Sequence, residues 1–505
     1  MIFNALVRFK GRLNPYFLLG SMMVVMVAVA VSCGGNVTFM QNQGMGTLSV
    51  TISDPPSCMP PNDHFIHVFI TVRSVQAHTS ATADDNSAGW QELAPQLSSG
   101  PMQVDLFSKP DTTCVLAQLG SASLPVGNLQ QIRLLLLSNS PAAGAAVPSP
   151  NACAGHGFNC VVLDDGTIHE LKLNSQDNTG LKIPPGQVMG GPIQVAAGQS
   201  VDLNIDFNAC ASIHREGNGT YSLKPTLTAG VVSANASGIG GQVVDSVTKK
   251  PISGNVIVAL EQPDGMGIDR IVMQTAADSN GNFRFCPLPL GTFDVVVVAL
   301  GPVNLPYNAT AVVNVPNGTN LNSIPLVAET GAAGPAILQG FVTAKTATAG
   351  AAADVTVAAL QTINVSASAT RQLTIPLQNT QATATTPVVM SMGLISITDS
   401  TTCPMGSPTG ANCAQYTIVV PASNPSVGVL APGGFTFSAP AGGDVLFSVD
   451  ANAFVPMTAP VNGGKTDCTP SETVTSTDGS TPPQPLKVTP ATTTSVARTD
   501  FTGCS

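Results

Sequence analysis

Residues 278–299 read DSNGNFRFCPLPLGTFDVVVVA, and the pattern in this stretch decides the fold. The Asn-Gly pair at 280–281 supplies the positive φ angles that a tight β-hairpin turn requires. Phe283 and Phe285 follow at alternate positions, and the alternation returns in the run 293–297. Because successive side chains of a strand point to opposite faces, each alternating set faces a core on one side. The stretch therefore predicts sheet strands joined by tight turns.

Turn-forming Gly and Pro residues occur throughout the chain. The 505 residues include 48 Gly and 40 Pro, and short runs rich in Val, Ile, Thr and Leu lie between them. Such runs are typical of short strands, and a chain of this length predicts about two to four domains. We expect an all-β protein of tandem β-sandwiches, Ig-like or prealbumin-like, without a long amphipathic helix. Clear half-buried strands are expected at 47–52, 65–75, 131–137 and 201–207.

The first segment has the order of a signal peptide. Arg8, Lys10 and Arg12 form a positive region, an apolar run covers 17–31, and small residues precede Cys33. These small residues resemble a bacterial lipobox, whose cysteine is acylated and becomes the mature N-terminus. The resemblance implies a lipoprotein signal peptide over 1–32 and a lipid on Cys33. An uncleaved signal anchor and ordinary cleavage are the alternatives.

A lipid on Cys33 would anchor the chain, because each buried CH₂ contributes about 0.8 kcal/mol and more than one chain holds stably. Gly34 lacks the aspartate that retains lipoproteins at an inner membrane, so the resemblance favours an outer membrane. Residues 33–45 are polar and Gly-containing and are expected to be a tether. No later apolar stretch reaches the roughly 20 residues that span a bilayer.

Several phrases in residues 46–232 are similar to one bacterial family known only as a domain of unknown function, common in exported lipoproteins. They include Gly46-Thr47-Leu48-Ser49-Val50, Val72-Arg73-Ser74-Val75-Gln76-Ala77-His78, Gly89-Trp90-Gln91-Glu92-Leu93, Gln131-Ile132-Arg133-Leu134 and Leu223-Lys224-Pro225. The resemblance implies a β-sandwich and no established chemistry. One departure is Leu129, which stands where the family usually has Tyr.

Residues 236–330 resemble the carboxypeptidase regulatory-like β-sandwich, which has a carbohydrate-binding-like fold. The resemblance rests on Gly240-Gly241-Gln242-Val243-Val244-Asp245, Val256-Ile257-Val258-Ala259-Leu260 and the hairpin described above.

Residues 334–460 are expected to be a diverged copy of that domain with an insertion over about 378–413. The equivalences are 340–342 on 241–243, 355–357 on 256–258, 435–437 on 283–285, and 445–449 on 293–297. Residues 461–505 are rich in Thr, Ser and Pro and are expected to be a partly disordered tail unless a disulfide pins it.

Cysteine usage agrees with export. Of the 11 cysteines, an even number remains once Cys33 is set aside, and exported proteins can keep disulfides. The expected pairs are Cys153–Cys160, Cys403–Cys413 and Cys468–Cys504. The sequence does not assign Cys58, Cys114, Cys210 and Cys286. The chain has no tight Cys-x-x-Cys pair, so we expect no metal site of cysteines.

The search for an active site finds no supporting motif. Gly-x-Ser-x-Gly, the phosphate-binding Gly-x-x-x-x-Gly-Lys-Ser/Thr loop and His-Glu-x-x-His are all missing. His64 and His67 are three apart in an expected strand, so they point to opposite faces. The Asp278 loop resembles the start of a calcium loop, but its twelfth position is Pro289 instead of Glu. We expect no catalytic residue, no cofactor and no metal, and not an enzyme.

Arg133 is the unusual charge, because it lies inside an apolar run. If it is buried it needs a carboxylate partner, for which Asp105 and Asp206 are candidates. The alternative is that Arg133 lies on the solvent face of an alternating strand.

Charge and aromatic content bound the function. Asp+Glu at 29 against Lys+Arg at 19 gives a net charge of −10, and no basic cluster follows residue 12, so a nucleic-acid partner is not expected. We expect a lipid-anchored structural or adhesive binding protein that contacts the membrane through its lipid. The alternative is a carbohydrate-binding accessory module, whose partner would be a polysaccharide; another surface protein is the other candidate partner. The single Trp and the four Tyr are scattered, which does not favour an aromatic sugar platform.

Overall fold

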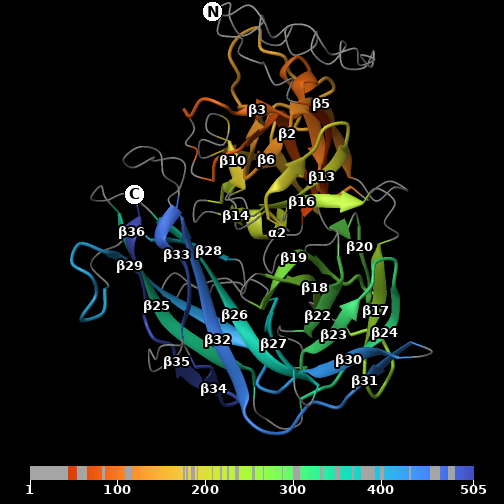
Figure 1. Ribbon diagram of the computed structural model, residues 1–505, viewed down its shortest axis with the longest axis vertical. Coiled ribbons are helices and arrows are strands. Elements are labelled where there is room, and N and C mark those ends of the chain that lie inside the picture. The colour runs from red at the N-terminus through yellow and green to blue at the C-terminus, as the bar shows by residue number, and fades with distance from the viewer. Residues whose placement is uncertain are drawn as a thin grey trace, which may run out of the picture. The chain divides into compact units, whose positions relative to one another are not determined.

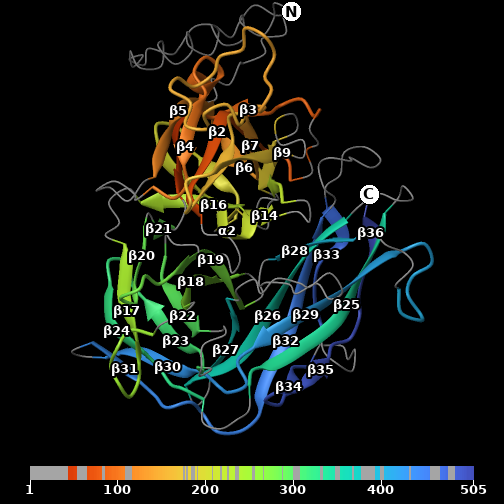
Figure 2. The ribbon, with the colours of Figure 1, turned by 180° about the vertical axis from the view of Figure 1, so that it is seen from behind.

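The computed structural model describes residues 44–504 with interruptions, of which the longest are 54–64, 377–392 and 455–466. Strands form nearly all of the regular structure (Figures 1 and 2). The only helices among the described residues are two single turns, η1 (Pro95–Ser98) and α2 (Ala209–Ser212). The expected all-β fold is therefore confirmed. Within the same residues, no helix is long and apolar enough to cross a membrane.

The first group of strands forms two main sheets. Its strands are β1 (Met45–Ser53), β2 (Phe65–His78), β3 (Gln91–Glu92), β4 (Met102–Asp105), β5 (Ala117–Pro125), β6 (Gly127–Leu129), β7 (Gln131–Leu136), β8 (Cys160–Leu163), β9 (Ile168–Leu173), β10 (Leu181–Ile183), β11 (Val188–Met189), β12 (Ile193–Val195), β13 (Ser200–Phe207), β14 (Ile213–Arg215), β15 (Tyr221–Leu223) and β16 (Leu227–Ser233). One sheet has the order β11-β16-β13-β1-β5 and the other β10-β7-β2-β8-β9-β15-β14. Leu48, Val50 and Ile52 alternate into the core from β1, as expected.

The second group carries the hairpin that decides the fold. Its strands are β17 (Ile239–Asp245), β18 (Val256–Pro263), β19 (Ile268–Ala276), β20 (Asn282–Phe285), β21 (Leu288–Pro289), β22 (Phe293–Ala299), β23 (Thr310–Val315) and β24 (Asn320–Leu326). Gly281 has a φ of 76° in the turn before β20. Phe283 and Phe285 are buried on one face with ring centroids 5.8 Å apart, which confirms the alternation.

The third group extends to the end of the described chain. Its strands are β25 (Ala336–Thr346), β26 (Ala353–Ser366), β27 (Ala369–Thr374), β28 (Gly393–Ile397), β29 (Asn412–Val420), β30 (Ser426–Ala431), β31 (Gly434–Phe437), β32 (Val445–Phe454), β33 (Asp467–Thr475), β34 (Leu486–Val488), β35 (Thr493–Ser495) and β36 (Thr499–Cys504). The described part of 461–505 thus contains four strands, where the sequence suggested a partly disordered tail unless a disulfide pins it. Its Thr-rich runs are β-prone and find partners in β25 and β32.

The second and third groups have the same topology. β17 pairs with β20 antiparallel and with β24 parallel, and β25 pairs with β29 antiparallel and with β36 parallel. β18 lies between β19 and β22, just as β26 lies between β27 and β32. We therefore name the two groups the second and third repeats.

In both repeats a glycine lies opposite an aromatic residue on the neighbouring strand, which supports this equivalence. Gly241 lies opposite Phe283, and Gly340 lies opposite Tyr416 on β29. A Cβ on Gly340 would come within 2.4 Å of the Tyr416 hydroxyl oxygen, so the glycine leaves room for the ring.

The expected placement of 435–437 on 283–285 is wrong. Those residues form β31, which pairs with β30 in an added hairpin, while β29 occupies the place of β20. The two segments share a Phe-x-Phe pattern because any half-buried strand alternates in this way.

One twelve-stranded sheet joins the repeats. Its order is β31-β30-β23-β22-β18-β19-β27-β26-β32-β33, with β28 and β34 beside it. The third repeat therefore flanks the four strands β23-β22-β18-β19 on both edges, through β27 on one side and β30 on the other. Each outer edge of those four strands is thus paired over part of its length, by two residue pairs at β19 and four at β23.

The four central strands are also covered on both faces. Val295 and Val297 pack into the core of the second repeat, whereas Val296 and Val298 pack into the core of the third. Strands buried on both faces have continuous apolar sequences, which explains the run of four valines in β22. The sequence analysis assigned only one of these faces.

The shared sheet predicts that both repeats unfold together. Phe293→Ala opens a cavity in the core of the second repeat and Phe447→Ala in that of the third, because both side chains are at most 1 % exposed. Each should destabilise the chain by about 3–5 kcal/mol. In differential scanning calorimetry of the full chain, both variants should lower the same transition. Val247→Ala is the matched control, since Val247 is 83 % exposed. Two transitions that shift independently would contradict the shared core.

Candidate functional site

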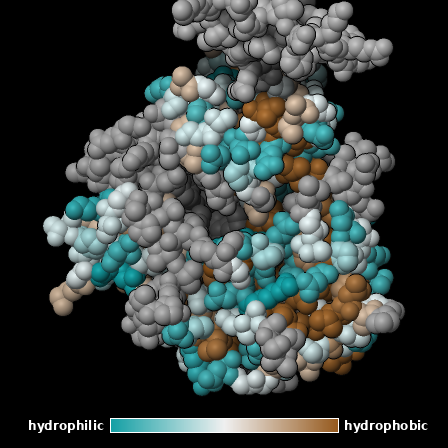
Figure 3. Space-filling view, viewed as in Figure 1, coloured by the Kyte–Doolittle hydropathy of each residue, from teal (hydrophilic) through white to brown (hydrophobic). Residues whose placement is uncertain are grey.

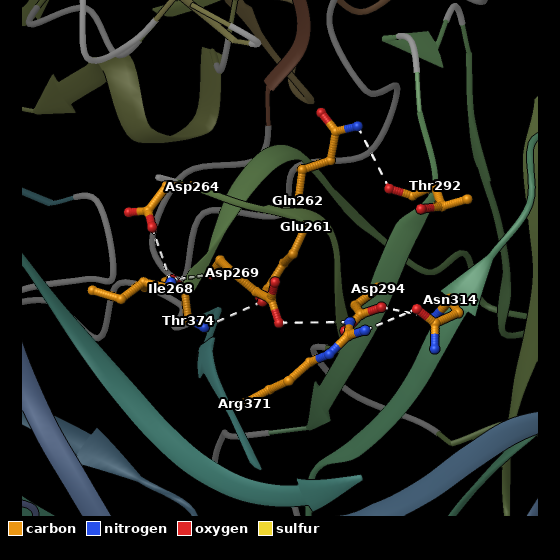
Figure 4. Close-up of polar contacts among 10 residues, drawn as sticks. All are labelled: Glu261, Gln262, Asp264, Ile268, Asp269, Thr292, Asp294, Asn314, Arg371 and Thr374. Carbon is orange, nitrogen blue, oxygen red and sulfur yellow. Dashed lines mark hydrogen bonds and ion pairs between the residues drawn. The ribbon is translucent and has the colours of Figure 1, made fainter. Parts of the chain in front are cut away.

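A cluster of buried charged side chains lies where the two repeats meet (Figure 4). Glu261 follows the apolar part of β18, and Asp269 and Asp294 are the second residues of β19 and β22, all in the second repeat. Arg371 and Thr374 come from β27 of the third repeat. We call these five residues the junction cluster. The side chains of Glu261, Asp269 and Asp294 are 0 %, 1 % and 2 % exposed, so the three carboxyl groups are withdrawn from water.

Local strand geometry places these carboxyls together. Glu261 is the direct partner of Asp294 in the antiparallel ladder of β18 and β22. The register of β18 against β19 shifts between Leu260 and Glu261, and such a bulge re-aims the side chains beside it. β19 then meets β27 in a parallel contact of only two residue pairs, one of which is Asp269 with Leu373.

Arg371 is the cation of the junction cluster. Its Nη1 binds the Asp294 carboxylate and lies 3.9 Å from Asp269 Oδ2. Its Nη2 donates to Asn314 Oδ1 at 2.8 Å, and the Asn314 backbone N–H donates to Asp294 Oδ1 at 2.7 Å. Figure 4 shows Arg371 reaching from β27 towards these acceptors. One guanidinium thus ties β27 to β22 and β23.

Thr374 adds a second tie between the repeats. Its backbone N–H donates to Glu261 Oε2 at 3.2 Å, and its hydroxyl donates to the Asp269 carbonyl oxygen at 2.7 Å. A third tie lies nearby, where Arg270 of β19 binds Asp450 of β32 at 2.5 Å. Each of these contacts crosses from the second repeat to the third.

Burial controls the protonation of the junction cluster. Burial raises the pKa of Asp269 to about 7; the Asp294 charge adds to the rise and Arg371 opposes it. Burial, reinforced by the charges of Asp269 and Asp294, raises the pKa of Glu261 well above its usual value. Like charges this close cannot all ionise, so the junction cluster retains protons at neutral pH. Because no carboxyl is more than 2 % exposed, a substrate cannot reach it. The arrangement suits a structural tie between strands.

A second candidate site is the outer face of the sheet β20-β17-β24. A groove of about 510 Å³ lies there, lined by glycines, amides, hydroxyls and one arginine. We call it the amide groove. Its lining includes Gly240, Gln242, Asn282, Arg284 and Asn320.

Disulfides join Cys153 to Cys160 and Cys403 to Cys413, which are two of the three pairs that the sequence favoured. Cys286, which the sequence left unassigned, is also disulfide-bonded. The proposed Cys468–Cys504 pair lies on β33 and β36, outside the described side chains. Cys33, Cys58 and Cys114 lie outside the described residues, and the side chain of Cys210 is not described either.

Arg133 does not take either carboxylate partner proposed for it. Its guanidinium carbon lies 4.1 Å from the centre of the Trp90 ring, and its Nε donates to Gln76 Oε1 at 2.7 Å. Asp105 instead pairs with His67 Nδ1 at 2.6 Å, and Asp206 accepts from a serine. The Trp90 ring and the Gln76 amide are thus two of the groups that Arg133 contacts.

The loop at Asp278 forms a turn. Asp278 Oδ1 accepts the backbone N–H groups of Asn280 and Asn282, each at 2.8 Å, which confirms a hairpin turn at this position. Among the described residues, no group of three or more His, Cys, Asp and Glu side chains is placed to hold a metal ion. His64 lies outside the described residues.

The sequence analysis missed the junction cluster. The available signal was a set of charges at inward positions of apolar strands, such as Glu261 directly after the run 256–260 and Asp294 directly before the four valines. Arg371 gave no signal, because it is 77 positions from Asp294.

A comparison with known proteins finds a match for the first group of strands, β1 to β16, which we call the first unit. Residues 45–225 match a family model described as "Domain of unknown function (DUF4382)", in agreement with the resemblance noted for 46–232. No curated protein matches the chain.

Several solved structures have some similarity. The shaft pilin SpaA of Lactobacillus rhamnosus GG has 11% identity and a TM-score of 0.16, with 56% of this chain and 98% of that chain covered. A minor pilin of Streptococcus agalactiae has 9% identity and a TM-score of 0.15, covering 53% and 96%. A DUF3823 family protein of Bacteroides uniformis has 12% identity and a TM-score of 0.15, covering 50% and 99%. Scores this low carry no argument about fold or function.

The ties across the junction predict a stability loss for Arg371→Met. Removing the cation leaves Asp294 buried without its partner, which should lower the free energy of unfolding by about 2–3 kcal/mol. This loss is small for a buried ion pair because the Arg371 side chain is 26 % exposed. Chemical denaturation of the full chain measures the loss. The control Lys487→Met breaks an exposed pair with Asp444, where the side chains are 63 % and 57 % exposed, and should cost less than about 1 kcal/mol. Equal losses in both variants would show that the junction cluster is not a tie.

Asp206 predicts a pH dependence in the first unit. Burial raises its pKa to about 7, and the hydrogen bond from Ser53 Oγ at 3.3 Å only partly opposes the rise. The unfolded carboxyl has a pKa of about 3.9, so its stabilising contribution is complete below about pH 4 and is lost as pH rises to about 7. The loss is about 1.4 kcal/mol per pH unit.

Asp206→Asn should remove this dependence. Denaturation of the wild type and of the variant between pH 4 and 8 measures the difference, and the two stability curves should converge in slope above about pH 7. Asp444→Asn, at an exposed carboxyl, is the control and should keep the slope of the wild type. If the Asp206→Asn and wild-type curves run parallel from pH 4 to 7, then Asp206 is ionised in the folded protein.

Proposed function

We propose that this chain is a lipid-anchored, non-catalytic protein of the bacterial surface that holds a binding face away from the membrane on a stiff β-body. The shared sheet carries this proposal. Two repeats that contribute strands to one sheet and side chains to each other's cores cannot hinge freely about a linker. Stiffness of this kind suits a spacer or adhesive protein.

The chemistry of the charged residues supports a non-catalytic role. A catalytic carboxyl must contact a substrate, whereas those of the junction cluster are at most 2 % exposed and bind strands of the neighbouring repeat. In the first unit, His67 pairs with Asp105 at the protein surface.

The anchor in this proposal is the lipid on Cys33, and the position of Gly34 favours the outer membrane. The tether 33–45 leads into β1, which begins at Met45. Fully extended, such a tether would separate the body from the lipid by up to about 40 Å.

The second candidate function is a carbohydrate-binding accessory module. The amide groove favours it, because a polar concave surface with many hydrogen-bonding groups matches the hydroxyl groups of a sugar. Surface display and sugar binding are compatible, so the two candidates are tested separately.

Fractionation of cells that produce the full chain tests the anchor. The wild type should remain with the membranes and be cleaved by protease added to intact cells, whereas Cys33→Ser should leave the membrane fraction because it cannot carry the lipid. The double variant Cys403→Ser/Cys413→Ser is the control, since it changes cysteines that form a disulfide far along the chain. Unchanged fractionation of Cys33→Ser, or protection of the wild type from protease, would overturn surface anchoring.

A further inference from the structure

The amide groove is a regular array on three paired strands. Gly240 of β17 lies between Arg284 of β20 and Asn320 of β24 in the two ladders. The next outward row places Gln242 between Asn282 and Ser323; the side chains of Asn282, Arg284, Asn320 and Ser323 are exposed and that of Gln242 is half-buried. Because Gly240 has no side chain, the first row has an open centre between two polar side chains. The groove of about 510 Å³ is within the range of roughly 300–1,000 Å³ for small-molecule sites.

The amides of the groove are held in place. Gln242 Nε2 donates to the Asn280 carbonyl oxygen at 2.9 Å, which leaves Oε1 to accept from a ligand. Asn320 Oδ1 accepts the Asn322 backbone N–H at 2.9 Å, which leaves the Nδ2 group to donate. Asn282 Nδ2 donates to Asp278 Oδ2 at 3.3 Å, which leaves its Oδ1. Side chains fixed before binding lose little entropy when a ligand arrives.

The third repeat provides an internal comparison. Gly340 matches Gly241, so the residue matching Gly240 is Gln339, and β29 places Thr417 opposite it. Gln339 Nε2 donates to Thr417 Oγ1 at 3.2 Å. The third repeat therefore fills the position that stays open in the second, and the open centre is a particular property of the second repeat.

Charge selects among sugars. Among the described residues that line the amide groove, Arg284 is the only charged one, in a chain whose net charge is −10. A guanidinium binds a carboxylate through two parallel hydrogen bonds. Aromatic stacking does not contribute, because Phe283, the aromatic residue of the lining, is 7 % exposed.

We propose that the amide groove binds a glycan whose sugars carry carboxylates, with Arg284 contacting a carboxylate and the fixed amides contacting hydroxyl groups. The proposal rests on the second candidate function and deepens it. The ligand class is a uronic-acid polysaccharide. Recognition comes from hydrogen bonds and one charge, so binding weakens as salt rises.

Calorimetric titration of the full chain in detergent with polygalacturonate tests this site. Wild-type protein should bind polygalacturonate and bind its methyl-esterified, uncharged form at least about tenfold more weakly, the value of a charge-assisted hydrogen bond. Arg284→Gln should weaken polygalacturonate binding by a similar factor. Gly240→Gln should abolish it, because it copies the filled position of the third repeat, where glutamine is accommodated at Gln339.

Lys487→Gln is the control, because it removes a positive charge that is 63 % exposed on β34 of the third repeat; it should bind like the wild type. Thermal melts should show that every variant folds. Equal binding of the charged and uncharged polymers would contradict recognition of the carboxylate but would still support glycan binding. Binding retained in Gly240→Gln would place the site elsewhere. If wild type binds neither polymer, this site is overturned, while the fractionation result for Cys33 still decides surface anchoring independently.

Discussion

Four strands, β23-β22-β18-β19, are covered on both faces and flanked on both edges, and this burial constrains everything around them. A strand buried on both faces needs apolar residues at every position, as in the valine run of β22. In β18 and β22 the charged groups then lie near the strand ends. The carboxyls of Glu261, Asp269 and Asp294 lie there, where β27 can reach them.

Figure 3 shows the described surface as mixed, with hydrophobic patches that include one at the lower right, near the β30–β31 hairpin.

The junction cluster is better understood as a specificity device than as a source of stability. Burying charges costs several kcal/mol per ion, and well-packed apolar residues often stabilise a protein as much or more. However, β19 and β27 share only two residue pairs, so backbone pairing alone defines their register weakly. Arg371 and Thr374 each recognise partners at fixed positions, and a slip of one residue would leave Asp294 buried without a cation. We infer that the ties fix the register of the two repeats.

The sequence predicted what depends on local pattern and missed what depends on distant partners. Alternation located β1, β2, β7 and β13, and the Asn-Gly pair located the hairpin before β20. It did not separate β29 from β31 as the match to β20, because alternation looks alike in every half-buried strand. Arg133 was recognised as unusual, but its contact with Trp90 joins β7 to the residue before β3, and no periodicity encodes a contact between segments so far apart in the chain. The amide groove was missed because glycines on a strand look like turns until their neighbours are known.

The comparison of the two repeats explains why a binding face would lie on β20-β17-β24. One face of the strands β23-β22-β18-β19 packs into the core of the second repeat, and the third repeat covers their other face. These strands therefore have no free face. Only the outer sheet can face a ligand, and its central glycine determines whether that face is hollow. Gly241 and Gly340 are retained in both repeats because each makes room for an opposing aromatic ring. Gly240 faces no aromatic ring; a Cβ there would lie 3.1 Å from the Phe283 carbonyl oxygen, and its counterpart in the third repeat is Gln339. A glycine that leaves an open centre beside an arginine and fixed amides is what a site for a ligand would need.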